Sequence, residues 1–157
     1  NFHFQNYVNM VNSFIFIWGR HMENIIKITY KEDAIIKAGE LSILFKSSGI
    51  KRPVNDLDRL QRMIENADVL ITAWDNGKLV GIARAITDYS YCCYLSDLAV
   101  NKEYQSKGIG RELVRLVQEH IGEEASLILL ASPIAMEYYP KIGFEAIDNG
   151  FIISRKR

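Results

Sequence analysis

The sequence predicts a single α/β domain in which helices flank a mixed central sheet. Residues 68–74, 78–87 and 91–100 are three strand-like segments joined by short turns, which is the pattern of an antiparallel meander. A glycine-bearing turn and an amphipathic helix pattern follow the third segment. The nearly all-apolar run 126–131 is typical of a strand that is buried on both faces and parallel to its neighbour.

The segments before the meander predict one strand and two helices. Residues 24–30 alternate loosely, which indicates a first strand at an edge of the sheet. Between residues 33 and 46 apolar side chains recur at helical spacing, and Gly49 suits the left-handed cap that ends a helix. Asn55 is expected to cap a second helix. The apolar face of that helix consists of Leu57, Leu60, Met63 and Ile64.

The chain after the meander predicts a helix, a strand and a C-terminal hairpin. The third helix carries one apolar stripe and is expected to end at Gly122. The buried strand 126–131 follows it, and residues 134–141 form a short helical piece. Residues 144–147 and 150–154 are expected to pair as two closing strands.

The composition is that of an ordinary soluble globular protein, with 48% hydrophobic and 24% charged residues. The 157 residues are enough for one domain with a proper core. Lys plus Arg equals Asp plus Glu, 19 of each, so the formal net charge is zero. We therefore expect no nucleic-acid partner and no binding to anionic membranes. The three histidines show no metal-ligand spacing, so we expect no metal.

Residues 1–21 resemble an expression tag. Gly19-Arg20-His21-Met22 resembles the end of a protease site followed by a common cloning site, so the natural domain is expected to comprise residues 22–157. A genuine, irregular N-terminal extension is the alternative. The longest apolar run of this segment, 14–18, is too short to span a bilayer, and the segment lacks the character of a signal peptide. We expect a cytoplasmic protein.

The turn between residues 100 and 113 follows a strand and opens a helix, which is the order that builds an anion site. The first N–H groups of a helix have no internal partner, and the helix dipole places partial positive charge there. Gly108 and Gly110 lack a Cβ, so a phosphate can come close to the backbone. A P-loop is disfavoured because it needs Lys after its last glycine, and Arg111 stands there. A dinucleotide-binding fingerprint is disfavoured because its third small position, which needs Gly or Ala, is occupied by Leu113. A plain tight turn is the structural alternative.

Two motifs resemble the signatures of the GCN5-related N-acetyltransferases, the GNAT superfamily. Residues 105–110, Gln-Ser-Lys-Gly-Ile-Gly, are similar to the acetyl-CoA signature Gln-x-x-Gly-x-Gly of this family. Residues 135–144, AMEYYPKIGF, are similar to its second pattern, A-x-x-[FY]-Y-x-x-x-G-F. The expected order of elements over residues 24–157 is also that of the GNAT fold, so the resemblance implies a mixed sheet whose middle strands splay apart.

The resemblance implies acetyl-CoA as the cosubstrate. Its pantetheine arm is expected where the two strands splay, because unpaired buried backbone groups are costly unless a ligand satisfies them. The implied contacts there are with the backbone of Leu98, Ala99 and Val100. The N–H groups implied for the pyrophosphate are those of Ser106, Lys107, Gly108, Ile109, Gly110 and Arg111, next to Gln105 of the same motif. Ser132 stands where many family members have an Asn that binds the pantetheine arm.

The implied chemistry is direct attack of a primary amine on the acetyl thioester in a ternary complex. By resemblance, the N–H of Leu98 stabilises the oxyanion and Tyr139 is the general acid for the departing thiolate. The positions at which many family members carry a basic Glu hold Tyr94 and Leu127 here, so Asp97 is the candidate general base. Pairing of Asp97 with Arg84 is the structural alternative.

The resemblance implies a small-molecule or peptide amine as the acceptor. Its pocket is expected from Phe45, residues 49–53, Arg84 and residues 89–91. Lys51 and Arg52 suggest an acidic group on the acceptor, although basic loop residues are commonly just solvated. The alternative function is a non-catalytic domain that binds or senses acyl-CoA, and a third reading is a nucleotide-binding α/β protein. GNAT proteins often dimerise, so a homodimer is compatible with the resemblance.

Overall fold

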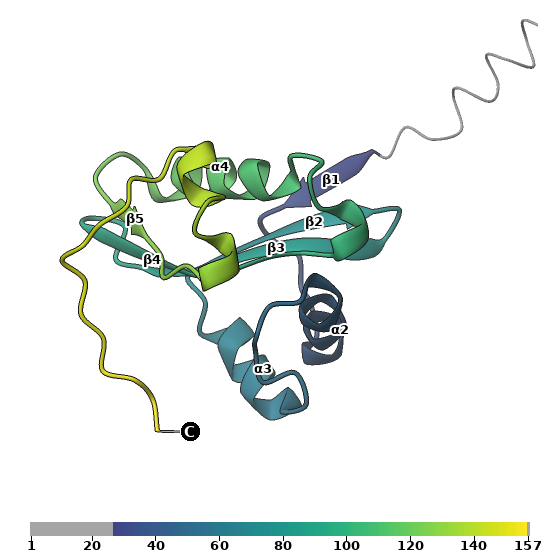
Figure 1. Cartoon of the computed structure of the whole chain (residues 1–157). Helices are drawn as coiled ribbons and strands as arrows, with labels where there is room; N and C mark the ends of the chain where they lie inside the picture. Colours follow the sequence, from purple (N-terminus) through teal and green to yellow (C-terminus); the bar gives the residue numbers. More distant parts are fainter. Residues whose placement is uncertain (1–26, 157) are drawn as a thin grey trace, which may run out of the picture.

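The computed structural model of the chain describes residues 27–156, and the segment 1–21, interpreted above as an expression tag, lies outside them. Five strands form one mixed sheet in the order β1-β2-β3-β4-β5 (Figure 1). The first three pairings are antiparallel and the β4–β5 pairing is parallel. The strands are β1 (Ile28–Lys31), β2 (Val69–Asp75), β3 (Lys78–Thr87), β4 (Cys92–Val100) and β5 (Ser126–Ile128). The helices are α2 (Ala38–Ser48), α3 (Leu57–Glu65) and α4 (Ile109–Ile121), with 3-10 turns η1 (Lys102–Tyr104), η2 (Pro133–Ala135) and η3 (Tyr139–Ile142).

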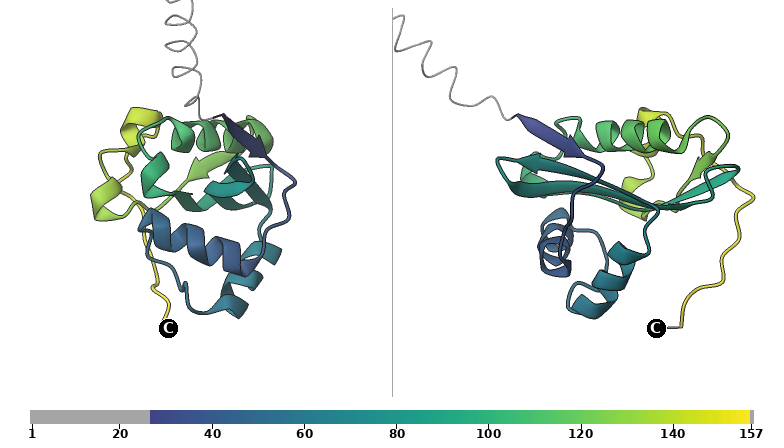
Figure 2. Two further views of the ribbon diagram at one scale, coloured as in Figure 1. Left: turned by 90° about the vertical axis from the view of Figure 1, so that its right-hand side faces the viewer. Right: turned by 180° about the vertical axis from the view of Figure 1, so that it is seen from behind.

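The helices cover both faces of the sheet, as the sequence predicts. Helices α2 and α3 lie on one face and α4 lies on the other (Figure 2). Each face has its own apolar core: Leu41, Phe45 and Leu60 pack against Ile82 and Ala99 on the first face. The second core is formed by α4 and the opposite side of the strands. No helix between residues 27 and 156 has the length and apolar character needed to cross a membrane.

Strands β4 and β5 separate soon after they meet, which confirms the expected splay. Their parallel pairing comprises three positions and ends where Tyr94 faces Ile128. Strand β4 continues to Val100, so its last six residues have no partner on the β5 side. β5 is the last strand of the sheet, so this opening lies at its β5 end, with α4 on one side of the sheet and α2 and α3 on the other (Figure 1).

A bulge in β4 lies next to this opening. Arg84 of β3 pairs with Asp97, but the next residue, Ala85, pairs with Leu95. Ser96 is therefore an extra residue on β4, and the bulge reverses which face the following side chains occupy. Leu95 packs with α4, whereas Asp97 lies on the face covered by α2 and α3.

Two of the predicted helix boundaries shift in the structure. Helix α2 begins at Ala38 rather than near residue 33, because Ile35 is 96% exposed and the Glu40 carboxylate accepts from the N–H of Lys37 at the new start. Gly49 ends this helix in the left-handed conformation, as expected. Helix α3 is capped by Asp56 and not by Asn55, because the Asp56 carboxylate accepts from the N–H of Arg59 at 2.9 Å.

The C-terminal part of the chain differs most from the prediction. Strand β5 ends at Ile128, and it is not buried on both faces, since Ile128 is 42% and Leu130 61% exposed. Residues 144–147 and 150–154 form no strands; the segment runs along the outside of the domain instead (Figure 2). A three-residue β5 offers too short an edge to extend the sheet by a hairpin, so Phe151 and Ile153 stay fully exposed. The expected helical piece 134–141 is divided into η2 and η3.

We predict that Gly81→Val destabilises the domain by about 1–3 kcal/mol, because overpacking forces the core apart. A Cβ at Gly81 would lie 3.2 Å from atoms of Ala73, Ile109 and Leu113, so α4 would have to move off β3. Gly39→Ala is the matched control, since nothing lies within 4 Å of its Cβ in helix α2. We expect that control to stabilise the fold by about 0.5–1 kcal/mol. Urea unfolding measures both, and a neutral Gly81→Val would contradict the close packing of α4.

Candidate functional site

The unpaired edge of β4 presents main-chain groups to the gap between β4 and β5. The N–H of Asn101 donates to the carbonyl of Val80 on β3 at 2.9 Å. Neighbouring residues of an antiparallel strand direct their N–H and C=O groups to opposite sides, so Ala99 also faces β3. Leu98 and Val100 therefore face the gap. The backbone groups of Leu98 and the N–H of Val100 are available to a ligand, whereas the Val100 carbonyl accepts from the Gln105 amide and the groups of Ala99 lie on the paired side.

Six consecutive main-chain N–H groups are free where the chain enters α4. The N–H groups of residues 106–111 donate to no acceptor among the described residues. Two residues of this run, Ser106 and Gly108, have left-handed backbones, with φ values of 62° and 83°. Such loops form concavities that bind anions, and the helix N-terminus adds partial positive charge. The loop can hold a diphosphate with main-chain donors alone.

The two glycines of the loop have different roles. Gly108 needs a left-handed backbone, and nothing lies within 4 Å of the position of its missing Cβ. At Gly110 the Tyr138 hydroxyl lies 2.5 Å from that position. Gly108 thus leaves the loop open on its outer side, and Gly110 makes room for a tyrosine of the second motif. The two sequence motifs are in contact.

The polar side chains of the predicted cofactor site hold the loop in place. The amide of Gln105 donates to the carbonyl of Val100 at 2.8 Å and to that of Ser48 at 3.3 Å. Lys107 lies over the ring of Tyr104 at 5.2 Å. Arg111 donates to the carbonyl of Lys141, which joins α4 to η3. Ser132 is exposed and immediately precedes η2.

Tyr139 lies in η3, with its ring edge-on to Tyr138 and Phe144 at centroid distances of 5.4 Å and 5.5 Å. Burial raises the pKa of the Tyr139 hydroxyl, and Tyr138 acts in the same direction. The Arg52 guanidinium has the opposite, smaller effect on this pKa. Tyr139 is therefore held as a neutral phenol within electrostatic reach of Arg52.

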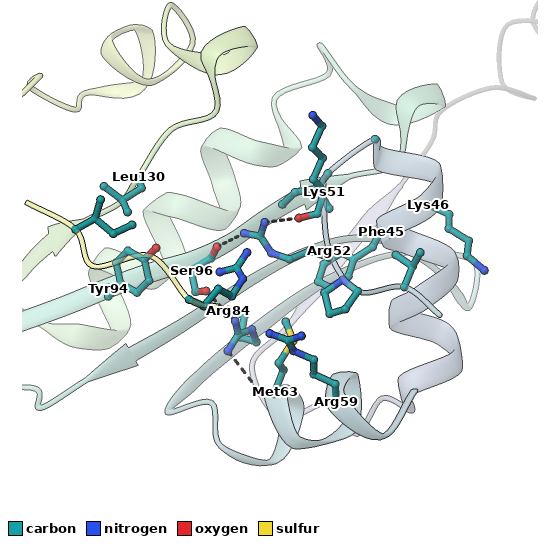
Figure 3. A pocket seen from close by; sticks show the side chains of 16 residues that line it. Phe45, Lys46, Lys51, Arg52, Arg59, Met63, Arg84, Tyr94, Ser96 and Leu130 are labelled. Carbon is teal, nitrogen blue, oxygen red and sulfur yellow. Dashed lines mark hydrogen bonds between the residues drawn. The ribbon is translucent and has the colours of Figure 1, made fainter. Parts of the chain in front are cut away.

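Asp97 forms a buried ion-pair cluster with two arginines. One carboxylate oxygen accepts from Nε of Arg52 and the other from Nε of Arg84, the latter at 2.5 Å. The Asp97 side chain is fully buried, and Arg84 also donates to the hydroxyl of Ser96 at 2.8 Å. Arg52 donates further to the carbonyls of Lys51 and Ser96 (Figure 3). The pairing of Asp97 with Arg84, which the sequence left as an alternative, is confirmed.

A cavity of about 760 Å³ opens beside this cluster. Tyr94 and Leu130 lie at one end of it, where β4 and β5 separate, and Lys46 of α2 lies at the other (Figure 3). Phe45, residues 49–53 and Arg84, which the sequence analysis named for an acceptor pocket, line this cavity. Residues 89–91 do not; the Tyr89 hydroxyl instead donates to the carbonyl of Asp68 in a different part of the sheet.

The sequence prediction missed several lining residues. Arg59 and Met63 come from α3, and Ile152 and Arg155 come from the C-terminal segment. Helical spacing placed Met63 with Leu57, Leu60 and Ile64 on the apolar face of α3 but gave no sign that this helix borders a cavity. The C-terminal residues were missed because the segment was expected to form a strand pair.

Residues 29–153 match the family described as the acetyltransferase (GNAT) domain. An uncharacterized N-acetyltransferase, ycf52, of Pyropia yezoensis is 32% identical over 118 residues, which cover 71% of this chain and 66% of the relative. The chloroplastic GCN5-related N-acetyltransferase 2 of Arabidopsis thaliana is 36% identical over 78 residues, which cover 46% of this chain. The aligned part spans just under two thirds of the first relative and 29% of the second.

Solved structures share the fold. A probable acetyltransferase of unknown function from methicillin-resistant Staphylococcus aureus superposes with a TM-score of 0.71 at 23% identity, covering 82% of this chain and all of that one. A GNAT family N-acetyltransferase of Escherichia coli, solved in complex with CoA, gives a TM-score of 0.63 at 19% identity and covers 80% of this chain and 72% of that one. The family match, the splayed strands and the loop at α4 agree: this chain belongs to the GNAT acetyltransferase family.

Proposed function

We propose that this chain transfers the acetyl group of acetyl-CoA to a primary amine within a ternary complex. The observation that carries the proposal is the run of six free N–H groups, residues 106–111, beside the unpaired edge of β4. The diphosphate of CoA supplies the anion that these donors need, and the amides of its pantetheine arm can pair with Leu98 and Val100. Both features belong to one continuous stretch of chain, so a single extended ligand satisfies them.

In the proposed reaction, the amine nitrogen attacks the acetyl carbonyl carbon. A C–N bond forms and the C–S bond breaks, while one amine proton is lost and the CoA sulfur receives a proton. The N–H of Leu98 points into the gap and can stabilise the developing oxyanion. The products are the N-acetylated amine and CoA.

Tyr139 is the proposed proton donor to the CoA sulfur. Its pKa is raised by burial, so it stays protonated throughout the neutral and mildly alkaline range. A neutral phenol can give a proton or a strong hydrogen bond to a thiolate, whose acid has a pKa of about 8.5. Tyr139 does not itself line the cavity proposed for the acceptor amine, but the charge of Arg52, which does line it, acts on the pKa of the Tyr139 hydroxyl.

Asp97 is proposed as a positioning residue instead of the general base. Both of its oxygens are engaged by guanidinium groups and its side chain has no exposed surface. A base must lie within hydrogen-bond reach of the proton that it removes, directly or through one water. We therefore assign the removal of the amine proton to water in the cavity, with Asp97 holding Arg52 in place.

We predict that Gly108→Ala weakens CoA binding about tenfold or more. A left-handed residue with a Cβ is strained by about 1–2 kcal/mol, and a loop that relaxes this strain loses its arrangement of amides. Gly77→Ala, in the turn between β2 and β3, is the matched control, because Gly77 has the same φ of 83° and an equally empty surrounding. Calorimetry with CoA should show the loss of affinity in Gly108→Ala and not in Gly77→Ala. Equal affinity of both variants for CoA would contradict the loop as the diphosphate site.

Tyr139→Phe should lower kcat by one to a few powers of ten, with CoA affinity little changed, since it removes only the proton donor. Thiol release from acetyl-CoA in the presence of amines measures this rate. The wild-type rate should not fall from ionisation of Tyr139 below pH 10, because its pKa is raised from 10.0. Tyr91→Phe, on an exposed tyrosine outside the cavity, is the control. An unchanged rate in Tyr139→Phe would remove this residue from the mechanism.

Asp97→Asn should destabilise the domain by about 3–5 kcal/mol, because it leaves two arginines without their buried counter-charge. Thermal or urea unfolding measures the loss. If Asp97 were also the general base, the turnover of the folded fraction would fall by powers of ten and its pH profile would lose the acidic limb, whereas a positioning residue leaves that limb in place. The two measurements together decide between the two roles.

A further inference from the structure

The cavity beside the splay is strongly asymmetric in charge. Six cationic side chains line it and no carboxylate does, although the whole chain has a formal net charge of zero. The six are Lys46, Lys51, Arg52, Arg59, Arg84 and Arg155. They come from four separate parts of the fold: the end of α2 with the loop that follows it, α3, β3 and the C-terminal segment. The folded chain, and not a local run of basic residues, creates this charge.

The one nearby carboxylate cannot balance these charges. Asp97 lies behind the cavity wall and pairs with Arg52 and Arg84 at once, which leaves one excess positive charge even within this cluster. The other four cationic side chains form no ion pair with a carboxylate of residues 27–156. Positive charges around one concave space raise the local concentration of anions. A ligand with a negatively charged group would supply the counter-charge that the cavity lacks.

The donors of Arg52 and Arg84 are already committed to the protein. Arg52 donates to Asp97 and to two carbonyls, and Arg84 donates to Asp97 and to the Ser96 hydroxyl. These two guanidinium groups therefore supply a fixed positive field. Lys51 and Arg59 still have donors for direct contact; Lys51 is exposed and Arg59 is half-buried at the α3 side of the cavity.

The position of the cavity shows which substrate it would receive. Tyr94, Ser96 and Leu130 line the end at which β4 and β5 separate, so this end adjoins the gap assigned to the thioester. The cationic side chains of the helices line the remainder (Figure 3). A volume of about 760 Å³ is within the range of about 300–1,000 Å³ that is typical of small-molecule sites. A small molecule can thus place an amine at the strand end and a negative group among the cations.

We propose that the acceptor is a small amine that carries an oxyanion, a carboxylate or a phosphate, which the cationic wall of this cavity binds. The inference rests on the proposed acetyl transfer and specifies its acceptor class. The same wall disfavours acceptors with additional positive charges, such as polyamines, aminoglycosides and lysines of basic peptides. Lys51 and Arg59 are the residues that determine this specificity by direct contact.

The first test compares acceptors that share a carbon chain and differ in charge. The probes are 4-aminobutanoate, butylamine and 1,4-diaminobutane, with thiol release from acetyl-CoA as the readout. We expect kcat/KM to be about tenfold or more higher for 4-aminobutanoate than for butylamine, and lowest for 1,4-diaminobutane, because opposite charges attract and like charges repel in a concave site. Added salt should reduce the difference. Equal values, or a preference for the diamine, would overturn the proposal.

The second test removes the contacts one at a time. Arg59→Gln and Lys51→Gln should each raise KM for 4-aminobutanoate several-fold while kcat and the KM for butylamine change little. Arg62→Gln is the matched control, because Arg62 is exposed on the same helix as Arg59 but does not line the cavity. A loss that is equal for both amines would show a structural role for Arg59 and Lys51 and would contradict the proposal.

Two further comparisons separate the sources of the oxyanion. A preference for 2-aminoethyl phosphate over ethanolamine, larger than that for 4-aminobutanoate over butylamine, would identify a phosphate; the reverse would identify a carboxylate. Faster turnover of a peptide with an acidic N-terminus than of any small probe would overturn the assignment to a small molecule. If CoA binds and butylamine is acetylated as well as 4-aminobutanoate, only this inference fails. If no probe is acetylated at all, the proposed function fails with it.

Discussion

The separation of β4 from β5 is the constraint on which the rest of the site depends. A parallel pair that continued past Tyr94 would satisfy the main-chain groups of Leu98 and Val100 within the sheet. The pair ends after three positions, so the Leu98 groups and the Val100 N–H stay open, and only the Val100 carbonyl has a partner, the Gln105 amide. Buried backbone groups without partners are costly, and a ligand with its own amides can compensate for them. The fold thus retains a binding site by leaving its sheet incomplete.

The packing around the gap keeps it open and connects it to the loop at α4. Helix α4 lies so close to β3 that a Cβ at Gly81 would touch two of its side chains, which fixes the start of the helix relative to β3. Gln105 joins the loop both to the end of β4 and to the end of α2. Tyr138 fills the space that Gly110 leaves. The first motif, the second motif and the strand edge therefore form one assembly, so that a shift in any of them would move the others.

The sequence could predict those features that depend on neighbours along the chain. The left-handed end of α2 at Gly49, the end of α4 at Gly122 and the strand–loop–helix order around residues 100–113 follow from local chemistry, and all are present. The irregular conformation of the C-terminal segment could not be predicted from neighbouring residues, because a strand needs a partner edge and β5 is too short to provide one. The cationic cavity was predicted only in part: residues 49–53 and Arg84 were expected at a pocket, whereas Arg59 and Arg155 are far apart in sequence and reach the same cavity only through the packing of α3 and the C-terminal segment.

The bulge at Ser96 explains how β4 can contribute both to the acceptor cavity and to the proposed thioester site. Without it, strict alternation would turn Asp97 toward α4, on the same face as Cys93 and Leu95. The extra residue lets Ser96 and Asp97 both lie on the α2–α3 side, where they hold Arg52 and Arg84 at the cavity. Beyond the bulge, the regular register resumes and directs the N–H of Leu98 into the gap. A single inserted residue therefore brings a fixed positive charge for the acceptor within two residues of the main-chain donor for the thioester.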